Sequence, residues 1–155
     1  TLLLLSKVEN GQYDDASEQN LTDYLKDVMA LNDEVYSGRG VSSSLNEGGQ
    51  FICRINDQMA SVLVGNLAKN AYIHSPRNSE VAVNVWDRGF SISNPGEEPL
   101  DRSRLFHRFY QPQGRREGST GLGLALAYSV CERNGLALEY EFKEKKHIFS
   151  VILKK

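Results

Sequence analysis

The pattern of apolar and polar positions predicts helices and strands that alternate along the chain. Apolar residues recur at helical spacing in three segments, 20–36, 57–73 and 122–133. Asn20 is placed to cap the first of these helices, and Gly38 and Gly40 follow its end. Pro76 ends the second, because the residue before a proline avoids the helical region of backbone space.

Alternation of apolar and polar positions predicts about six short strands. They cover residues 41–44, 50–55, 80–86, 90–93, 136–142 and the last apolar run, 149–153. Asp87, Arg88 and Gly89 predict a hairpin turn between the third strand and the fourth. We expect an α/β sandwich, with the helices on one face of a mixed, mostly antiparallel sheet.

Two regions follow neither period. Residues 1–13 are either the end of a helix that begins upstream or a frayed terminus, and residues 14–19 are expected to form a linker. Residues 94–120 are rich in Pro, Gly, Arg and Gln. A loop of this length inside a compact domain is usually functional.

Length and composition indicate one ordinary globular domain. The chain has 155 residues, of which 40% are hydrophobic and 25% charged, and its formal net charge is -2. This charge argues against nucleic acid as a partner. Cys53 and Cys131 lie inside apolar runs and are predicted to be buried thiols. The sequence shows no signal peptide and starts with Thr1 rather than Met, so we expect a piece of a longer protein.

Asn66 and Asn70 are four residues apart and therefore share one face of the second helix. An exposed pair of asparagines would need no explanation, but helix interiors disfavour this residue. An amide oxygen is a suitable ligand for Mg²⁺, which takes its other ligands from water and phosphates. The pair alone is a weak signal, because exposed asparagines on a helix are common.

Glycines directly before the third helix predict a site for an anion. Gly118, Gly121 and Gly123 let the backbone come close to a ligand, and the helix then presents its first N–H groups to it. Leu122 and Leu124 would anchor the segment to the core. The order of residues fits neither the Walker loop nor the dinucleotide fingerprint.

Aromatic and basic residues cluster inside the long loop. Phe106, Phe109 and Tyr110 surround Arg108, which suggests a segment that packs down over a ligand in one state. Arg108 is a candidate for meeting phosphate charge, whereas Arg115 and Arg116 are as readily explained as surface residues. The three histidines show no spacing typical of a metal site or of nucleophilic catalysis.

Together these blocks resemble the ATP-binding catalytic domain of two-component sensor histidine kinases, a family related to DNA gyrase B, heat-shock-90-type chaperones and mismatch-repair ATPases. Residues 66–71 with His74 resemble its N box, 105–110 its F box and 118–124 its second glycine box. The resemblance implies the Bergerat α/β sandwich over residues 20–155. Residues 1–19 would be the end of the dimerisation helix and a linker.

The resemblance also implies roles for single residues. Asn70, with Asn66, would hold Mg²⁺, and Asn70 and Arg108 would act in catalysis. The nucleotide would contact residues from all three boxes and from the segment before the F box: Asn66, Asn70, His74, Asn94, Gly96, Phe106, Phe109, Tyr110, Gly118, Thr120, Gly121, Leu122, Gly123 and Leu124. The mobile lid would have its tip at residues 111–117.

Two positions depart from the family pattern. The family usually has an aspartate that accepts the amino group of adenine, and here Asn94 takes that place, with Glu98 where a second glycine is usual. The rival register, Asp87 to Gly89, serves better as the hairpin turn. A neutral acceptor in place of a charged one costs about 1 kcal/mol. Ile73 stands where family members often carry a phosphate-facing lysine, so both departures predict weak nucleotide binding.

The implied function is a protein histidine kinase that binds Mg-ATP and transfers its γ-phosphoryl to a histidine on a separate upstream domain. The implied partners are that dimerisation domain, a response regulator and a second copy of the full-length protein. The implied location is cytoplasmic, with the parent anchored in the inner membrane. The alternatives are a non-catalytic nucleotide-sensing or docking module, which Asn94 and Ile73 favour, and an anti-sigma-type serine kinase, which the F box disfavours.

Overall fold

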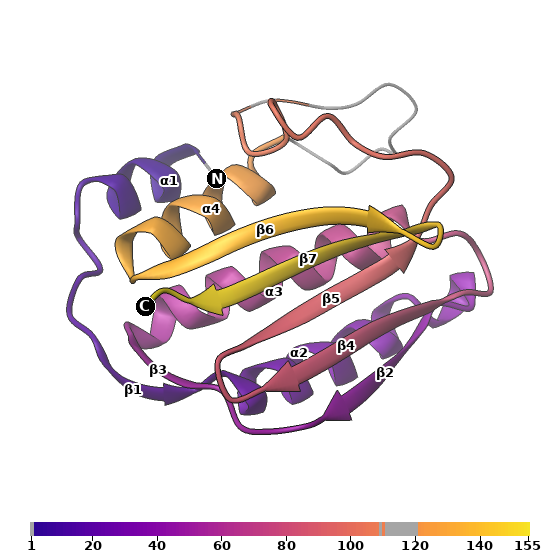
Figure 1. Cartoon of the computed structure of the whole chain (residues 1–155), viewed down its shortest axis with the longest axis horizontal. Coiled ribbons are helices and arrows are strands. Elements are labelled where there is room, and N and C mark those ends of the chain that lie inside the picture. The colour runs from indigo at the N-terminus through magenta and orange to yellow at the C-terminus, as the bar shows by residue number, and fades with distance from the viewer. Residues whose placement is uncertain (1, 109, 111–120) are drawn as a thin grey trace.

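The computed structural model describes residues 2–108, 110 and 121–155 (Figure 1). In chain order, the elements of these residues are α1 (Leu2–Glu9), β1 (Ser17–Asn20), α2 (Leu21–Val35), the 3-10 helix η1 (Ser37–Arg39), β2 (Ser42–Glu47), β3 (Ile52–Ile55), α3 (Asp57–His74), β4 (Glu80–Trp86), β5 (Gly89–Pro95), α4 (Gly123–Arg133), β6 (Leu136–Lys143) and β7 (Lys146–Leu153). The three predicted helices and the predicted β4–β5 hairpin are confirmed.

Five strands form the main sheet in the order β2-β4-β5-β7-β6 (Figure 1). The pair β2–β4 is parallel and the other three pairs are antiparallel, so the prediction of a mixed, mostly antiparallel sheet is confirmed. A second, two-stranded sheet pairs β1 with β3. We had expected residues 14–19 to be a linker, because β1 contains no apolar residue. Its extended form comes instead from pairing with β3, a contact between distant parts of the chain.

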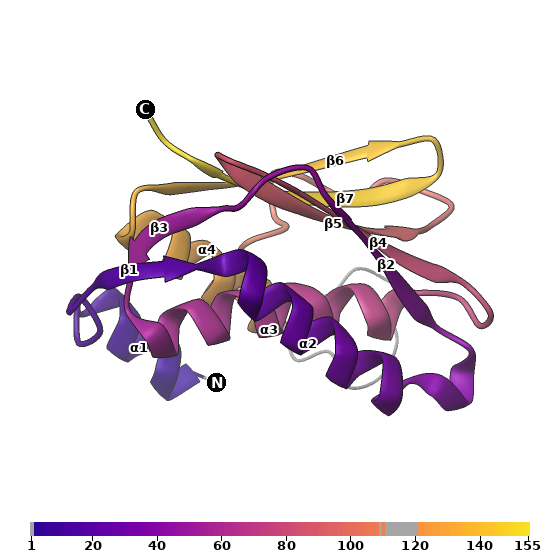
Figure 2. The ribbon, with the colours of Figure 1, turned by 90° about the horizontal axis from the view of Figure 1, so that it is seen from below.

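The helices lie together on one side of the main sheet (Figure 2). On β4, Val81, Val83 and Val85 point into the layer between the sheet and the helices and are buried, whereas Asn84 is exposed on the other face. This arrangement is the expected two-layer sandwich. Both Cys53 and Cys131 are buried free thiols, as predicted, and burial raises the pKa of the Cys53 thiol to about 11. Within the described residues, no helix is long and apolar enough to cross a membrane.

Helix α1 packs against α4, so the first residues form an ordered helix and not a frayed end. Leu5 and Val8 supply the contact and are only 1% and 3% exposed. The Arg133 guanidinium, at the end of α4, pairs with Asp14 (2.5 Å) and donates to the carbonyl of Glu9 (3.4 Å). That residues 1–19 are the end of a dimerisation helix and a linker stays a prediction.

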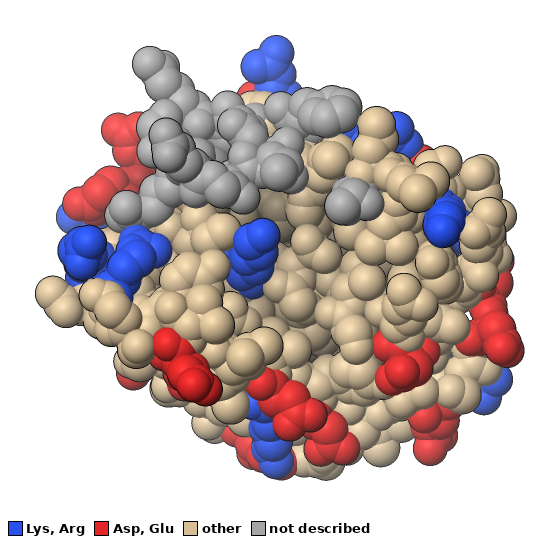
Figure 3. All heavy atoms as spheres, turned by 180° about the vertical axis from the view of Figure 1, so that it is seen from behind, with Lys and Arg blue, Asp and Glu red and all other residues tan. Residues whose placement is uncertain are grey.

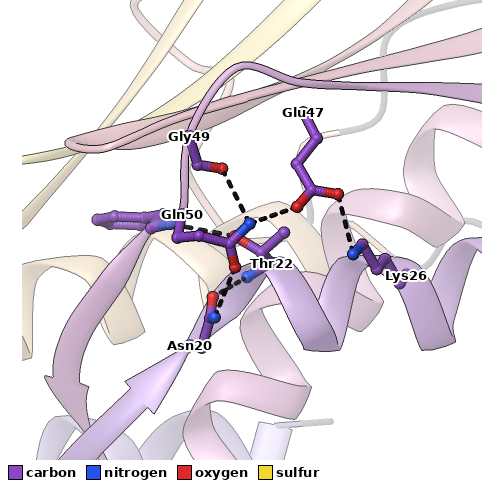
Figure 4. A network of polar contacts seen from close by, with 7 residues as sticks. Asn20, Thr22, Lys26, Glu47, Gly49 and Gln50 are labelled. Carbon is purple, nitrogen blue, oxygen red and sulfur yellow. Dashed lines mark hydrogen bonds and ion pairs between the residues drawn. The ribbon is translucent and has the colours of Figure 1, made fainter.

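A closed polar network fixes the start of α2 (Figure 4). Asn20 caps the helix: its Oδ1 accepts from the N–H of Thr22 (3.0 Å) and its Nδ2 donates to Oε1 of Gln50 (2.8 Å). Gln50 in turn donates to Glu47, and Glu47 pairs with Lys26 (2.9 Å). The predicted N-cap is therefore confirmed.

Candidate functional site

The asparagine pair of α3 lies beside the start of α4. Nδ2 of Asn66 donates to the carbonyl of Val62 (2.8 Å), which fixes the orientation of the amide. A Cβ added to Gly123, the first residue of α4, would lie 3.1 Å from Oδ1 of Asn66. Asn70 follows one turn later on α3 and is half-buried. The start of α4 thus lies directly beside the Asn66 amide, although the two segments are far apart in sequence.

The first turn of α4 offers backbone donors. Gly121 has a φ of +77°, in the left-handed region that favours glycine, and so turns the chain into the helix. The N-cap residue is Leu122, whose own side chain makes no capping hydrogen bond. Leu122 and Leu124 pack against the core. The N–H groups of the first turn have no intrahelical partner and form a suitable place for an anion.

Asn94 lies near the end of β5, facing the helices. It shares the inner face of the strand with Phe90 and Ile92, both core residues, and α3 packs against this strand. Asn94 is only 1% exposed. Its Nδ2 donates to the carbonyl of Pro95 (3.3 Å), and its Oδ1 has no hydrogen-bond partner among the described residues. A buried acceptor without a partner costs about 1–3 kcal/mol, and such groups often belong to functional sites.

The segment after β5 is fixed to the β6–β7 hairpin. The N–H of Gly96 donates to the carbonyl of Lys145 (2.9 Å), and a Cβ at this position would collide with the imidazole of His147. Nδ1 of His147 contacts the hydroxyl of Tyr140 (2.8 Å), which also accepts from the N–H of Leu100 (3.0 Å). Any larger residue at position 96 would therefore displace the imidazole of His147. Sequence reasoning missed His147, because its partners become neighbours only in the folded sheet.

Aromatic stacking attaches the F box to α4. The ring of Phe106 stacks on Tyr128 of α4, with centroids 5.1 Å apart, and meets the edge of Phe149 at 6.4 Å. Tyr110 is half-buried against the core. Tyr128 was not among the predicted site residues, although its position four residues after Leu124 places both on one face of α4. Several predicted positions lie outside the described residues: Phe109, Gly118, Thr120, Arg115, Arg116 and the lid tip, 111–117.

Arg108 forms an ion pair with Glu9 of α1, not with a residue of the pocket. Both side chains are more than 40% exposed, so the pair is a surface contact of small energy. A role of Arg108 in catalysis stays a prediction.

Hydrogen bonds made by Arg39 and by Tyr72 hold the C-terminal end of α3. The Arg39 guanidinium donates to the carbonyls of Tyr72 (3.1 Å) and Ser75 (2.5 Å), near the end of the helix. The hydroxyl of Tyr72 donates to Asp33 of α2 (2.5 Å), and burial, followed by this hydrogen bond, raises the pKa of Tyr72. These contacts fix the helix that carries Asn66 and Asn70. His74, its last residue, is half-buried.

Uncharged atoms make up most of the helix-covered face, on which the charged side chains are scattered and a Lys or Arg side chain lies near the middle (Figure 3). The candidate residues Asn66, Asn70 and Asn94 carry neutral amides, and the first turn of α4 adds backbone N–H groups. Among the described residues, no group of three or more His, Cys, Asp or Glu could hold a metal ion. The amide oxygens of Asn66 and Asn70 are ligands of another kind and remain the candidates for Mg²⁺.

Residues 56–155 match the family described as histidine kinase-, DNA gyrase B-, and HSP90-like ATPases, and the chain belongs to this family. Its homologues are sensor histidine kinases. The sensor protein QseC of Escherichia coli O157:H7 is 31% identical over 144 residues, which cover 90% of this chain and 31% of QseC. This chain spans about a third of the length of the curated relatives it matches first.

Solved structures of histidine kinases share the fold. The catalytic domain of histidine kinase ThkA superposes with a TM-score of 0.79 at 18% identity, covering 91% of this chain and 96% of ThkA. Histidine kinase AdeS of Acinetobacter baumannii gives a TM-score of 0.75 at 18% identity, covering 99% of this chain and 74% of AdeS. The expected Bergerat-type sandwich is thereby confirmed.

Proposed function

We propose that this chain binds Mg-ATP and transfers the γ-phosphoryl group to a histidine on a separate upstream dimerisation domain. The observation that carries the proposal is the buried Oδ1 of Asn94, which has no partner among the described residues. An acceptor in this state suits an exocyclic amino group such as that of adenine. Membership of the ATPase family supports the same ligand.

The other residues of the site fit the phosphates and their metal ion. Asn70, with Asn66, would hold Mg²⁺ through neutral oxygens, and the first turn of α4 at Gly123 would bind phosphate through its N–H groups. A Cβ at Gly123 would lie 3.1 Å from Oδ1 of Asn66 and would push this amide aside by a few tenths of an ångström. When bound, Mg²⁺ neutralises phosphate charge, which is most of what phosphoryl transfer requires from its surroundings. His74, Gly96, Phe106 and Tyr110 would complete the pocket wall.

The acceptor histidine would lie outside this chain. His147 is packed between the rings of Tyr140 and Phe142, and His74 ends the helix of the pocket itself. We therefore assign the acceptor to an upstream helical domain of a longer parent protein. This parent would form a homodimer and pass the phosphoryl group to a response regulator. It would be anchored in the inner membrane, with the present domain in the cytoplasm. The greater length of the sensor kinase relatives supports a longer parent.

A second candidate is a nucleotide-sensing or docking module without turnover. Two positions favour it: Asn94 is neutral where the resemblance implies an aspartate, and Ile73 is half-buried on α3 where it implies a lysine. Both changes remove charge that would hold or polarise the nucleotide.

The test is the melting temperature of the 155-residue chain with millimolar ATP, in the presence and in the absence of Mg²⁺. A ligand at about 100 times its dissociation constant stabilises the folded state by about 2.7 kcal/mol. We expect this shift in the wild type and in Asn84→Ala, on the far face of the sheet, and its loss in Asn70→Ala. No shift in the wild type would refute the proposal. A shift without transfer of labelled phosphoryl to the parent's dimerisation domain would favour the sensing module.

A further inference from the structure

The amide of Asn94 can do what a carboxylate at the same place cannot. A carboxylate only accepts hydrogen bonds, whereas an amide carries an acceptor, Oδ1, beside a donor, Nδ2. Adenine presents an amino donor at C6 and guanine presents a carbonyl acceptor there. A fixed acceptor that faces C6 therefore pairs with adenine and repels the carbonyl of guanine, whereas a group that can present either atom there pairs with both bases.

The surroundings hold this amide loosely. Its one hydrogen bond among the described residues runs from Nδ2 to the carbonyl of Pro95, the adjacent residue, at 3.3 Å. The cross-strand neighbour His147 does not take Oδ1, because its Nδ1 contacts Tyr140 and its Nε2 lies against Gly96. A half-turn of the amide about its last side-chain torsion exchanges the two atoms without moving the backbone, and that torsion is broad and roughly two-fold.

We propose that Asn94 makes the nucleotide site tolerant of the base, so that it takes guanine as well as adenine nucleotides. This inference rests on the function proposed above. In the orientation that the structure shows, Oδ1 is ready to accept the amino group of adenine. After the half-turn, Nδ2 donates to the carbonyl of guanine.

Adenine keeps an advantage, because the half-turn gives up the bond to Pro95 and turns Oδ1 toward its carbonyl. The advantage is smaller than for a carboxylate, which would face the guanine carbonyl oxygen with a negative charge and no donor. Sites that leave buried polar groups unpaired reject the wrong ligand strongly. Asn94 thus sets the degree of base discrimination and leaves phosphate binding to the other residues.

The experiment compares the dissociation constants of Mg-ATP and Mg-GTP, measured by calorimetry on the wild type, Asn94→Asp and Asn94→Ala. The ratio of the two constants within one variant cancels any loss of stability caused by the substitution. We expect the GTP-to-ATP ratio to rise at least about tenfold in Asn94→Asp, since a charged acceptor gains with adenine and loses with guanine. Asn84→Asp, an exposed position on the other face of the sheet, brings the same change of charge and should leave the ratio unchanged.

An equal ratio in the wild type and in Asn94→Asp would overturn the inference while leaving ATP binding intact. Absence of binding by both nucleotides in the wild type would overturn the proposed function and this inference with it. Should Asn94→Asp not fold, Asn94→Ala decides: we expect weaker binding of both nucleotides, and unchanged affinity for both would refute a role of this side chain.

Discussion

Two asparagines in this molecule differ in how completely the fold pairs their amide groups. Asn20 uses both atoms of its amide: Oδ1 caps α2 and Nδ2 donates to Gln50, inside the network of Figure 4. Asn94 is more deeply buried, yet its Nδ2 makes one long bond to its neighbour Pro95 and its Oδ1 makes none with any described residue.

The difference teaches where to look for function in this fold. Burial penalises polar groups unless they are paired, so a folded chain pairs nearly all of them. Where pairing is complete, as at Asn20, the group stabilises the fold. Where an acceptor is buried and has no partner among the described residues, as at Asn94, the free energy of unfolding is lower than it need be, and a ligand with a donor group would satisfy the acceptor.

The largest expected loss of stability comes from removing the fully hydrogen-bonded amide of Asn20. Asn20→Ala removes the cap of α2 and the partner of Gln50, and should lower the free energy of unfolding by about 1–2 kcal/mol. Urea denaturation measures this change, and the shift caused by Mg-ATP should remain. Asn46→Ala is the control: this exposed side chain bonds only Asn84 among the described residues, and its loss should cost less than about 0.5 kcal/mol. Equal costs for the two variants would contradict the contrast.

Replacing Asn94 should raise the free energy of unfolding, whereas replacing Asn20 should lower it. Asn94→Leu exchanges the amide for an apolar group of similar size and should raise the free energy of unfolding by roughly 1 kcal/mol, because a buried acceptor without a partner disappears. The same variant should bind Mg-ATP more weakly, which calorimetry can measure. A clear loss of stability would show that Asn94 is satisfied in the folded protein and would remove the basis of the comparison.

Substituting two helical glycines, one beside the candidate site and one away from it, should change the free energy of unfolding by a smaller amount. Gly65→Ala in α3 adds a methyl group into open space and should gain about 0.5–1 kcal/mol through helix propensity. At Gly123 the added Cβ meets Asn66, so Gly123→Ala should gain less and should weaken the Mg-ATP shift. Thermal melting with and without Mg-ATP distinguishes them, and equal shifts in both variants would argue against a nucleotide near Gly123.

The smallest expected change in stability comes from the Lys26–Glu47 ion pair, which belongs to the network around Asn20. The hydrogen bond from Lys26 holds the pKa of Glu47 below its usual value of 4.5, so the ion pair stabilises the fold above that pH and loses its contribution as pH falls below it. Lys26→Met should therefore melt slightly below the wild type at pH 7, and the difference should vanish in acid. A difference that persists at low pH would assign the effect to packing of the lysine side chain.

Local pattern was enough to predict the helices, the β4–β5 hairpin and the cap at Asn20, because each depends on residues a few positions apart. The same local pattern predicted a linker where β1 lies. The extended form of β1 depends on pairing with β3, which is more than 30 residues away in sequence. The site shows the same division. Helical spacing was enough to place Asn66 and Asn70 on one face of α3. The approach of Asn66 to Gly123 and the unpaired oxygen of Asn94 depend on tertiary packing.

The position of β7 governs when this chain can fold as it leaves the ribosome. β7 follows every other element in sequence, yet it lies between β5 and β6 in the sheet. A nascent chain that has emerged as far as β6 lacks the strand that joins β6 to β5, and the core residues Phe90 and Ile92 lack their cross-strand partners Val151 and Phe149. Translation through residues 146–153 therefore precedes closure of the sheet, and a ribosome that stalls before them exposes an apolar strand to chaperones and proteases.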